Sequence, residues 1–155
     1  MELITDRTSE DLARWRLLHD KGWLAMSEAE RAEWLGEMKG RYAHTDMNRV
    51  ENAVKTLSAR LQELGYKHPS LSTKTNWARS DVPTKADFDR YFGNVGKLRQ
   101  VISIPASTPM APNTSVQLDY QQANDLEQIL MVVDEVTTKL MQSWCYAGDI
   151  FSGEV

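Results

Sequence analysis

One stretch of regularly spaced apolar residues, between residues 42 and 65, constrains the fold of this chain more than any other feature. Thr45 and Asp46 are residue types that begin helices, and Gly65 is a type that ends them. The apolar residues between them recur at alternating intervals of three and four: Met47, Val50, Val54, Leu57, Leu61 and Leu64. That spacing is typical of a helix with one face packed against another helix. It predicts packed helices and indicates no reaction chemistry.

Size and composition place the chain among ordinary globular domains. Its 155 residues are 41% hydrophobic and 26% charged, which suits a single domain spanning 1–155. The lone cysteine, Cys145, excludes an internal disulfide and every multi-cysteine metal site. The acidic, polar start is unlike a signal peptide, and no run of about 18 apolar residues occurs. We therefore expect a protein that folds in a reducing cytosol and does not enter a membrane.

Capping signals and apolar periodicity predict an all-α fold, a bundle of about five helices with two long connecting loops. Ser27 and Glu30 form a capping box, Gly40 is the expected end of that second helix, and Thr84 with Asp87 opens the fourth. The β-branched end of the fourth helix is also compatible with a short strand. The expected helices are 9–20, 27–39, 46–64, 84–102 and 119–146.

The third and fifth predicted helices carry matching apolar seams. We expect them to form the central pair of the bundle, antiparallel or nearly so. Packing within the chain is favoured over an oligomeric coiled coil because two and a half heptads are short for an independent coiled coil.

Two connections, residues 66–82 and 105–118, are longer than a compact helical bundle requires. The first contains Trp77 and Arg79; the tryptophan either plugs the loop onto the core or anchors a partner. The second holds three of the five prolines and no charge, so we expect it either to lie rigidly across the bundle or to contact another subunit. Residues 147–155 form a possible C-terminal arm that docks on its own bundle or on a neighbour. The candidate interface residues are Trp77, Arg79, Met110, Ile150, Phe151 and Val155.

Charge is unevenly distributed along the chain. Residues 66–104 carry seven Lys or Arg and three Asp or Glu, whereas residues 119–155 carry one and seven. The basic middle is too weakly charged for a nucleic-acid footprint, which needs a clustered basic stripe. The opposite signs indicate pairing between helices of one chain or between neighbouring subunits.

No catalytic, metal or cofactor motif is present in the sequence. The three histidines, His19, His44 and His68, lack the helical spacing of a metal pair. There is no glycine-rich phosphate loop, no serine nucleophile motif and no paired carboxylate constellation. We therefore expect no catalytic residue, bound metal, cofactor or small-molecule substrate.

Several stretches nevertheless resemble one protein family along nearly the whole chain. They are WLAMSEAERAEWL (23–35), TDMNRVENAV (45–54), TKTNW (73–77), DVPT (81–84), NVGKLR (94–99), DYQQANDLEQIL (119–130) and AGDIFSGE (147–154). The chain resembles small helical structural proteins encoded in the tail-morphogenesis modules of phages and prophages, chiefly of Firmicutes. None of these stretches is a chemical signature, so the resemblance carries no catalytic or receptor-binding residue.

The resemblance implies a non-enzymatic structural subunit of a tail tip, baseplate or related particle. Its expected partners are copies of itself and other tail proteins, with no nucleic acid and no membrane. Its expected location is the host cytoplasm during assembly and then the virion tail. A helical adaptor protein outside a virion is the alternative, and an enzyme with an unrecognised site is a third.

Overall fold

The fold is all-α, as predicted. The computed structural model describes residues 2–68, 70–113 and 118–151, with side chains described as far as Ser143. Within those ranges there are five α-helices and one short 3-10 helix, and no strand. The elements are α1 (Ser9–Lys21), η1 (Trp23–Ala25), α2 (Glu28–Leu35), α3 (His44–Glu63), α4 (Lys85–Val101) and α5 (Tyr120–Phe151).

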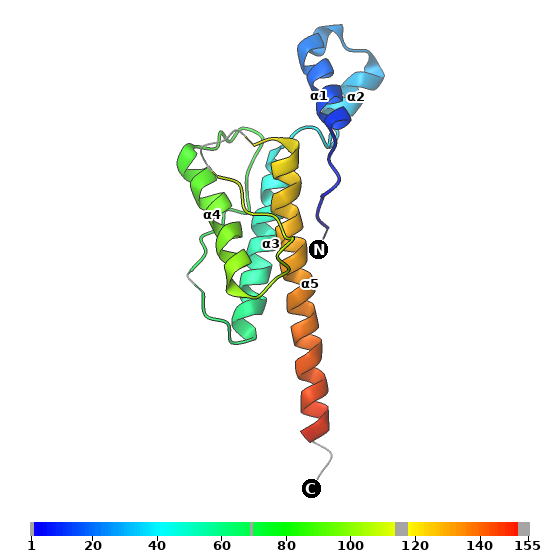
Figure 1. Cartoon of the computed structure of the whole chain (residues 1–155). Helices are drawn as coiled ribbons and strands as arrows, with labels where there is room; N and C mark the ends of the chain where they lie inside the picture. Colours follow the sequence, from blue (N-terminus) through cyan, green and yellow to red (C-terminus); the bar gives the residue numbers. More distant parts are fainter. Residues whose placement is uncertain (1, 69, 114–117, 152–155) are drawn as a thin grey trace.

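Helices α3, α4 and α5 lie side by side and all run in the same direction (Figure 1). Arg49 of α3 pairs with Glu127 of α5, and further along both helices Arg60 pairs with Asp134. The prediction of an antiparallel α3–α5 pair is therefore wrong, although the two helices do form the most extensive contact in the fold. The matching apolar seams could not decide this, because such a seam packs against a parallel or an antiparallel neighbour.

Parallel helices explain why the two connections are so long. A 20-residue helix such as α3 is about 30 Å long, so the chain must travel back that distance before starting a parallel neighbour. Both returning segments pack along α4. Asn94 donates a hydrogen bond to the Ser72 carbonyl at 2.7 Å, and Arg99 donates to the Pro109 carbonyl at 2.6 Å. The loops are structural crossovers of the bundle.

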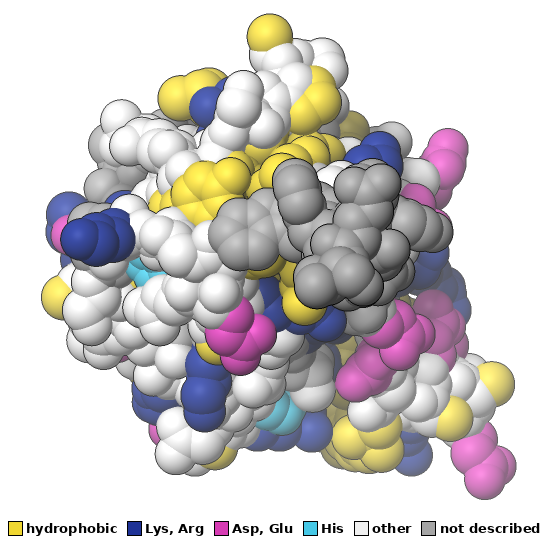
Figure 2. Space-filling view, turned by 90° about the horizontal axis from the view of Figure 1, so that it is seen from below, with side chains coloured by type: hydrophobic (Ala, Val, Ile, Leu, Met, Phe, Trp, Pro, Cys, Tyr) yellow, Lys and Arg dark blue, Asp and Glu magenta, His cyan; other side chains and the backbone are white. Residues whose placement is uncertain are grey.

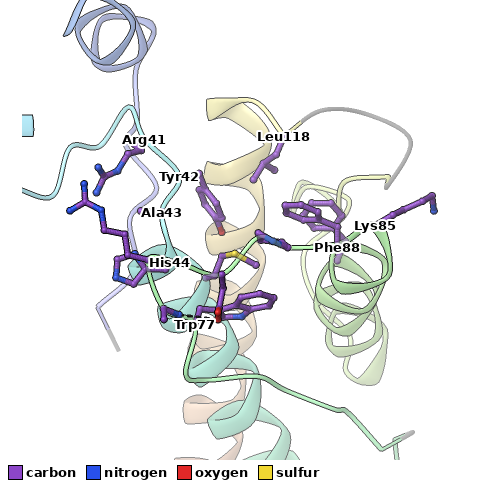
Figure 3. A pocket seen from close by; sticks show the side chains of 14 residues that line it. Arg41, Tyr42, Ala43, His44, Trp77, Lys85, Phe88 and Leu118 are labelled. Carbon is purple, nitrogen blue, oxygen red and sulfur yellow. Dashed lines mark hydrogen bonds between the residues drawn. The ribbon is translucent and has the colours of Figure 1, made fainter. Parts of the chain in front are cut away.

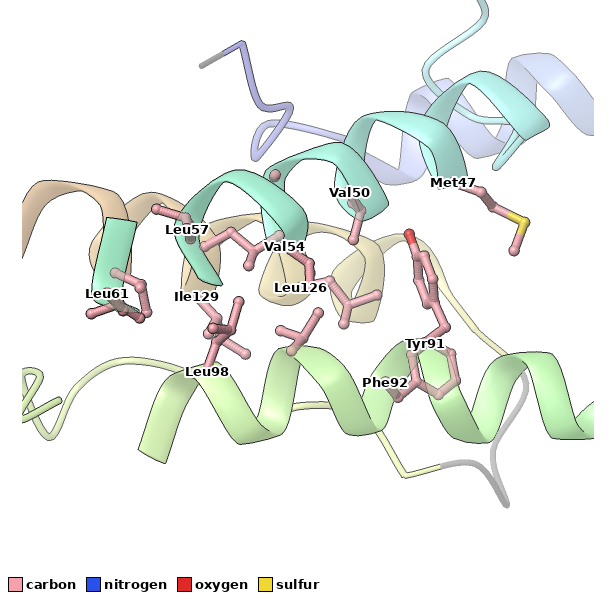
Figure 4. Packing of buried hydrophobic residues seen from close by; sticks show 14 of the residues in the cluster. Met47, Val50, Val54, Leu57, Leu61, Tyr91, Phe92, Leu98, Leu126 and Ile129 are labelled. Atoms are coloured by element: carbon pink, nitrogen blue, oxygen red, sulfur yellow. The ribbon is translucent and has the colours of Figure 1, made fainter. Parts of the chain in front are cut away.

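The core lies between α3, α4 and α5 (Figure 4). All six apolar seam residues of α3 are buried, as their spacing predicted, and Leu57 is fully inaccessible. From α4 come Tyr91, Phe92, Val95 and Leu98, and from α5 Leu126, Ile129, Leu130 and Val133.

The first two helices form a separate small hairpin above the three-helix core (Figure 1). Thr8 with Asp11, and Ser27 with Glu30, make the reciprocal hydrogen bonds of capping boxes. Between the helices, the rings of Trp15 and Trp34 stack with centroids 6.5 Å apart.

Helix α2 ends at Leu35, four residues before the predicted end at residue 39. Gly36 caps it, because its backbone N–H donates to the carbonyls of Ala32 and Glu33 while its own backbone is extended. The chain then folds back so that Gly40 lies against the backbone of Asp11, where a β-carbon would be 2.0 Å from the carbonyl oxygen. Gly40 is therefore a contact with α1 and not a helix end.

Other helix ends differ from their predictions by smaller steps, except at α5. Helix α3 begins two residues early, and Asp46, expected as a cap residue, lies inside it and accepts from the backbone N–H of Ala43. Gly65 does take the positive φ (84°) expected after the helix. Helix α5 continues to Phe151, five residues beyond the predicted end, and Gly148 does not interrupt it.

Candidate binding groove

A hollow of about 700 Å³ lies at the end of the bundle where α3, α4 and α5 begin. Its walls combine the start of α3, the 77–83 connection, the first turn of α4 and Leu118, just before α5. Aromatic side chains form much of its surface: Tyr42, Trp77, Phe88 and Phe92 (Figure 3). A groove of this size with apolar walls and few polar groups suits an apolar side chain or a short peptide segment.

Trp77 is held rigidly in the wall of this groove. The Asn48 side chain donates to the Trp77 carbonyl at 2.9 Å and accepts from its backbone N–H at 2.7 Å. The indole is only 4% exposed and belongs to the hydrophobic core, and the Lys74 ammonium lies 3.8 Å from its ring centroid. Trp77 therefore plugs the connection onto the core, and the groove is built around it.

The polar groups of the groove are mainly cationic. Arg41, Arg79 and Lys85 contribute three positive charges, and Asp81 contributes one carboxylate. Hydrogen bonds from Lys74 and from the Ala78 backbone N–H lower the pKa of Asp81, so this group is ionised at neutral pH. Lys85 pairs with Asp89 on the surface of α4, whereas Arg41 and Arg79 form no ion pair within the described residues. The groove thus favours an anionic ligand.

Tyr42 connects the groove to a buried charge network. Its hydroxyl lies 2.5 Å from that of Tyr91, and the Arg7 guanidinium is 5.5 Å from its ring centroid. Burial raises the pKa of both tyrosines above the ordinary value of 10.0. Both phenols are therefore neutral at physiological pH and act as hydrogen-bonding groups.

The network behind Tyr42 consists of two arginines and two carboxylates from three segments. Arg7 contacts Asp46 at 2.9 Å and Glu127 at 2.7 Å. Arg49 contacts both carboxylates as well, through Nε and Nη2 to Glu127 and through Nη2 to Asp46. Burial opposes the charge on Arg49, but the hydrogen bonds that it donates to Glu127 and Asp46 raise its pKa above the ordinary arginine value. Two arginines face two carboxylates, so the charges balance. The ion pairs of Arg7 hold the N-terminal segment against α3 and α5.

This network was missed in the sequence. The sequence indicated no role for Glu127, yet its side chain is fully buried. The available signal was its position between the core residues Leu126 and Leu130, on the face that α5 turns toward the bundle.

The predicted interface residues that the structure describes do not lie together at one site. Arg79 is exposed at the rim of the groove, while Met110 is 68% exposed beside a shallow hollow against α4. Ile150 and Phe151 were expected beyond the last helix but lie within α5, because the helix continues through Gly148. Val155 lies outside the described residues.

The second notable surface is the far end of α5, which leaves the bundle. Thr137 is the last residue of α5 whose side chain is described as buried, and α3 ends at Glu63, one turn past the Arg60–Asp134 pair. Roughly 14 further residues of α5, about 20 Å, project beyond the other helices (Figure 1). Seen along the bundle from that end, hydrophobic side chains are visible beside the projecting helix (Figure 2).

The described residues contain no cluster of three or more His, Cys, Asp or Glu side chains placed to hold a metal ion. Nor does any described helix have the length and hydropathy needed to cross a membrane. No protein-family model, curated protein or solved structure matches the chain. What the structure defines is therefore a parallel three-helix bundle with an N-terminal helical hairpin, an aromatic and basic groove at one end and a projecting helix at the other.

Proposed function

We propose that this protein is a non-enzymatic structural subunit that acts through protein–protein interfaces, present in several copies in a phage tail tip, baseplate or related particle. The observation that carries the interface proposal is the projecting end of α5. Most helical stability in proteins comes from packing of an apolar face, so we infer that this end, which projects beyond the other helices, packs against a partner.

Exposed apolar side chains on the N-terminal hairpin and on the two long connections support an interface function. Leu17, Leu24 and Leu35 of the hairpin region are 57%, 92% and 59% exposed, and Val82 and Met110 of the two connections are 86% and 68% exposed. Single exposed apolar residues are common, so their contribution to the proposal is that several large ones occur on the small hairpin and on the two connections, where a partner could cover them.

The phage assignment rests on the family resemblance of the sequence stretches between residues 23 and 154. It is tested by purifying phage or defective prophage particles from the cell that encodes the chain. Quantitative mass spectrometry is expected to find the chain in several copies per particle, and antibody labelling is expected to mark one end of the tail. If the chain is absent from purified particles, the tail assignment is wrong.

The alternative is a helical adaptor outside a virion, which the same projecting helix and groove would serve. The genes that flank the coding sequence separate the two proposals. Tail-assembly genes on both sides favour the structural subunit, and their absence favours the adaptor.

A further inference from the structure

We propose that the groove at the start of the bundle binds residues 147–155 of a second copy of this chain, so that copies join head to tail. This inference rests on the proposed function as a multi-copy subunit and names the contact between copies.

The groove and the tail lie at opposite ends of the molecule. All three bundle helices begin at the groove, and Leu118, which lines it, comes immediately before α5. The 32 residues of α5 then carry the chain about 48 Å away. Residues 152–155 span at most about 14 Å even when fully extended. The tail therefore cannot return to the groove of its own chain, and a second copy must supply the occupant.

The chemistry of the tail matches that of the groove. From residue 140 onward the only charged side chains are Asp149 and Glu154, both acidic, and they alternate with the apolar Ile150, Phe151 and Val155. The groove offers aromatic walls for apolar side chains and three cations against one carboxylate. Apolar anchors in an aromatic groove provide affinity, while opposite charges at its rim provide orientation and partner choice.

A contact between two different surfaces has a consequence for the assembly. Because groove and tail are different patches, a pair of bound copies still presents one free groove and one free tail, to which further copies can add. Such a heterologous contact produces a ring when the rotation between copies closes, and an open filament when it does not. Both outcomes are larger than a dimer.

The test reverses the charges of the groove and of the tail in the full chain and measures how strongly the chain self-associates. Wild-type protein is examined by sedimentation velocity from about 10 µM to about 1 mM, a range that detects self-association with dissociation constants between those two concentrations. We expect species larger than a dimer that weaken as NaCl rises from about 0.05 M to about 0.5 M, because salt screens the rim charges. A wild-type chain that stays monomeric throughout, or forms only a dimer, overturns the inference.

Two pairs of substitutions then locate the contact. Arg79→Glu with Lys85→Glu reverses the groove, and Asp149→Lys with Glu154→Lys reverses the tail. Each pair is expected to weaken association at least tenfold, and the chain with all four changes is expected to associate again. Lys55→Glu with Lys67→Glu is the matched control, since it makes the same charge change at exposed sites outside the groove.

Failure of the four-fold variant to regain association, with its thermal unfolding unchanged, overturns the inference, as does equal weakening by the control pair. These outcomes are independent of the particle experiment. The chain can be found in tails while the charge exchange fails, in which case only the groove–tail contact is wrong. It can also assemble through groove and tail yet be absent from particles, in which case the tail assignment is wrong.

Discussion

At the scale of single residues, stability is concentrated in the α3 seam and in the buried charge network. These positions differ in physical character. The seam is apolar and tolerates little change of volume, whereas the network is polar and tolerates little change of charge.

Leu57→Ala is expected to lower the free energy of unfolding by about 2–5 kcal/mol, because the side chain is fully buried among α3, α4 and α5 and its loss leaves a cavity. Urea denaturation followed by circular dichroism measures the change. Leu24→Ala is the matched control, since Leu24 is 92% exposed and its truncation is expected to cost less than about 0.5 kcal/mol. A loss below about 1 kcal/mol for Leu57→Ala would show that the seam does not form the core.

Glu127→Gln is expected to cost about 3–5 kcal/mol, because it leaves the charges of Arg7 and Arg49 with only Asp46 as a buried counter-charge. Chemical denaturation at neutral pH measures this cost. Glu135→Gln removes a carboxylate from the exposed pair with Lys139 and is expected to cost less than about 1 kcal/mol. Similar costs for the two variants would show that the network does not hold the N-terminal segment.

At the scale of elements, the hairpin of α1 and α2 is joined to the rest of the molecule by few contacts, and it is held together by surface ion pairs. Gly40 sets how closely the chain leaving the hairpin approaches α1, and Glu30 and Glu33 of α2 pair with cations of α1. Both features can be tested without altering the three-helix core.

Gly40→Ala is expected to destabilise the hairpin, because the added β-carbon would lie 2.0 Å from the Asp11 carbonyl oxygen and the backbones would have to separate. Hydrogen exchange of the α1 amides measures the effect as faster exchange. Gly93→Ala is the control: no atom lies within 4 Å of the added carbon, and alanine in a helix stabilises by about 0.5–1 kcal/mol relative to glycine. Unchanged exchange in α1 of the Gly40 variant would contradict the close approach.

Acid is expected to loosen the hairpin. The hydrogen bond from Lys21 lowers the pKa of Glu30 to about 2, and the hydrogen bonds from Arg14 lower the pKa of Glu33. Because the folded pKa values are below the unfolded value of 4.5, the stabilisation is complete above that pH and is lost as the pH falls toward 2.

The indole N–H signals of Trp15 and Trp34, followed by NMR from pH 6 to pH 2, report this loosening because the two rings stack between the helices. In the double variant Glu30→Gln, Glu33→Gln, the change over that pH window is expected to be much smaller. An equal change in the double variant would assign the acid effect to other groups.

At the scale of the whole molecule, the three parallel helices place the aromatic and basic groove and the projecting helix at opposite ends. This polarity is what a subunit needs in order to add to a growing assembly in one direction. The core and the two proposed assembly surfaces are therefore separate parts of the structure.

Deleting residues 148–155 is expected to leave the free energy of unfolding within about 0.5 kcal/mol of the full chain, because the described core of α5 ends near Thr137. The same deletion is expected to prevent incorporation into particles in a complementation experiment. Normal incorporation of the truncated chain would show that the tail is not an assembly contact.

The sequence by itself determined the fold class, three of the five helices (α1, α3 and α4) to within three residues at each end, and the buried face of α3. These are local properties: spacing decides which face is apolar, and Thr8, Ser27 and Thr84 decide where three helices begin through hydrogen bonds to residues three positions away. The sequence also showed that the two connections are long, but it did not show that they are crossovers between parallel helices.

The tertiary structure alone decided the direction of the helices and the location of the groove. A seam of apolar residues packs equally well against a parallel or an antiparallel neighbour, so periodicity carries no information about direction. The groove combines Tyr42, the stretch from Trp77 to Lys85, and Leu118, three parts of the chain that meet only because both crossovers return to the same end of the bundle. The buried pairing of Arg7 with Glu127, 120 residues away, depends on that same return.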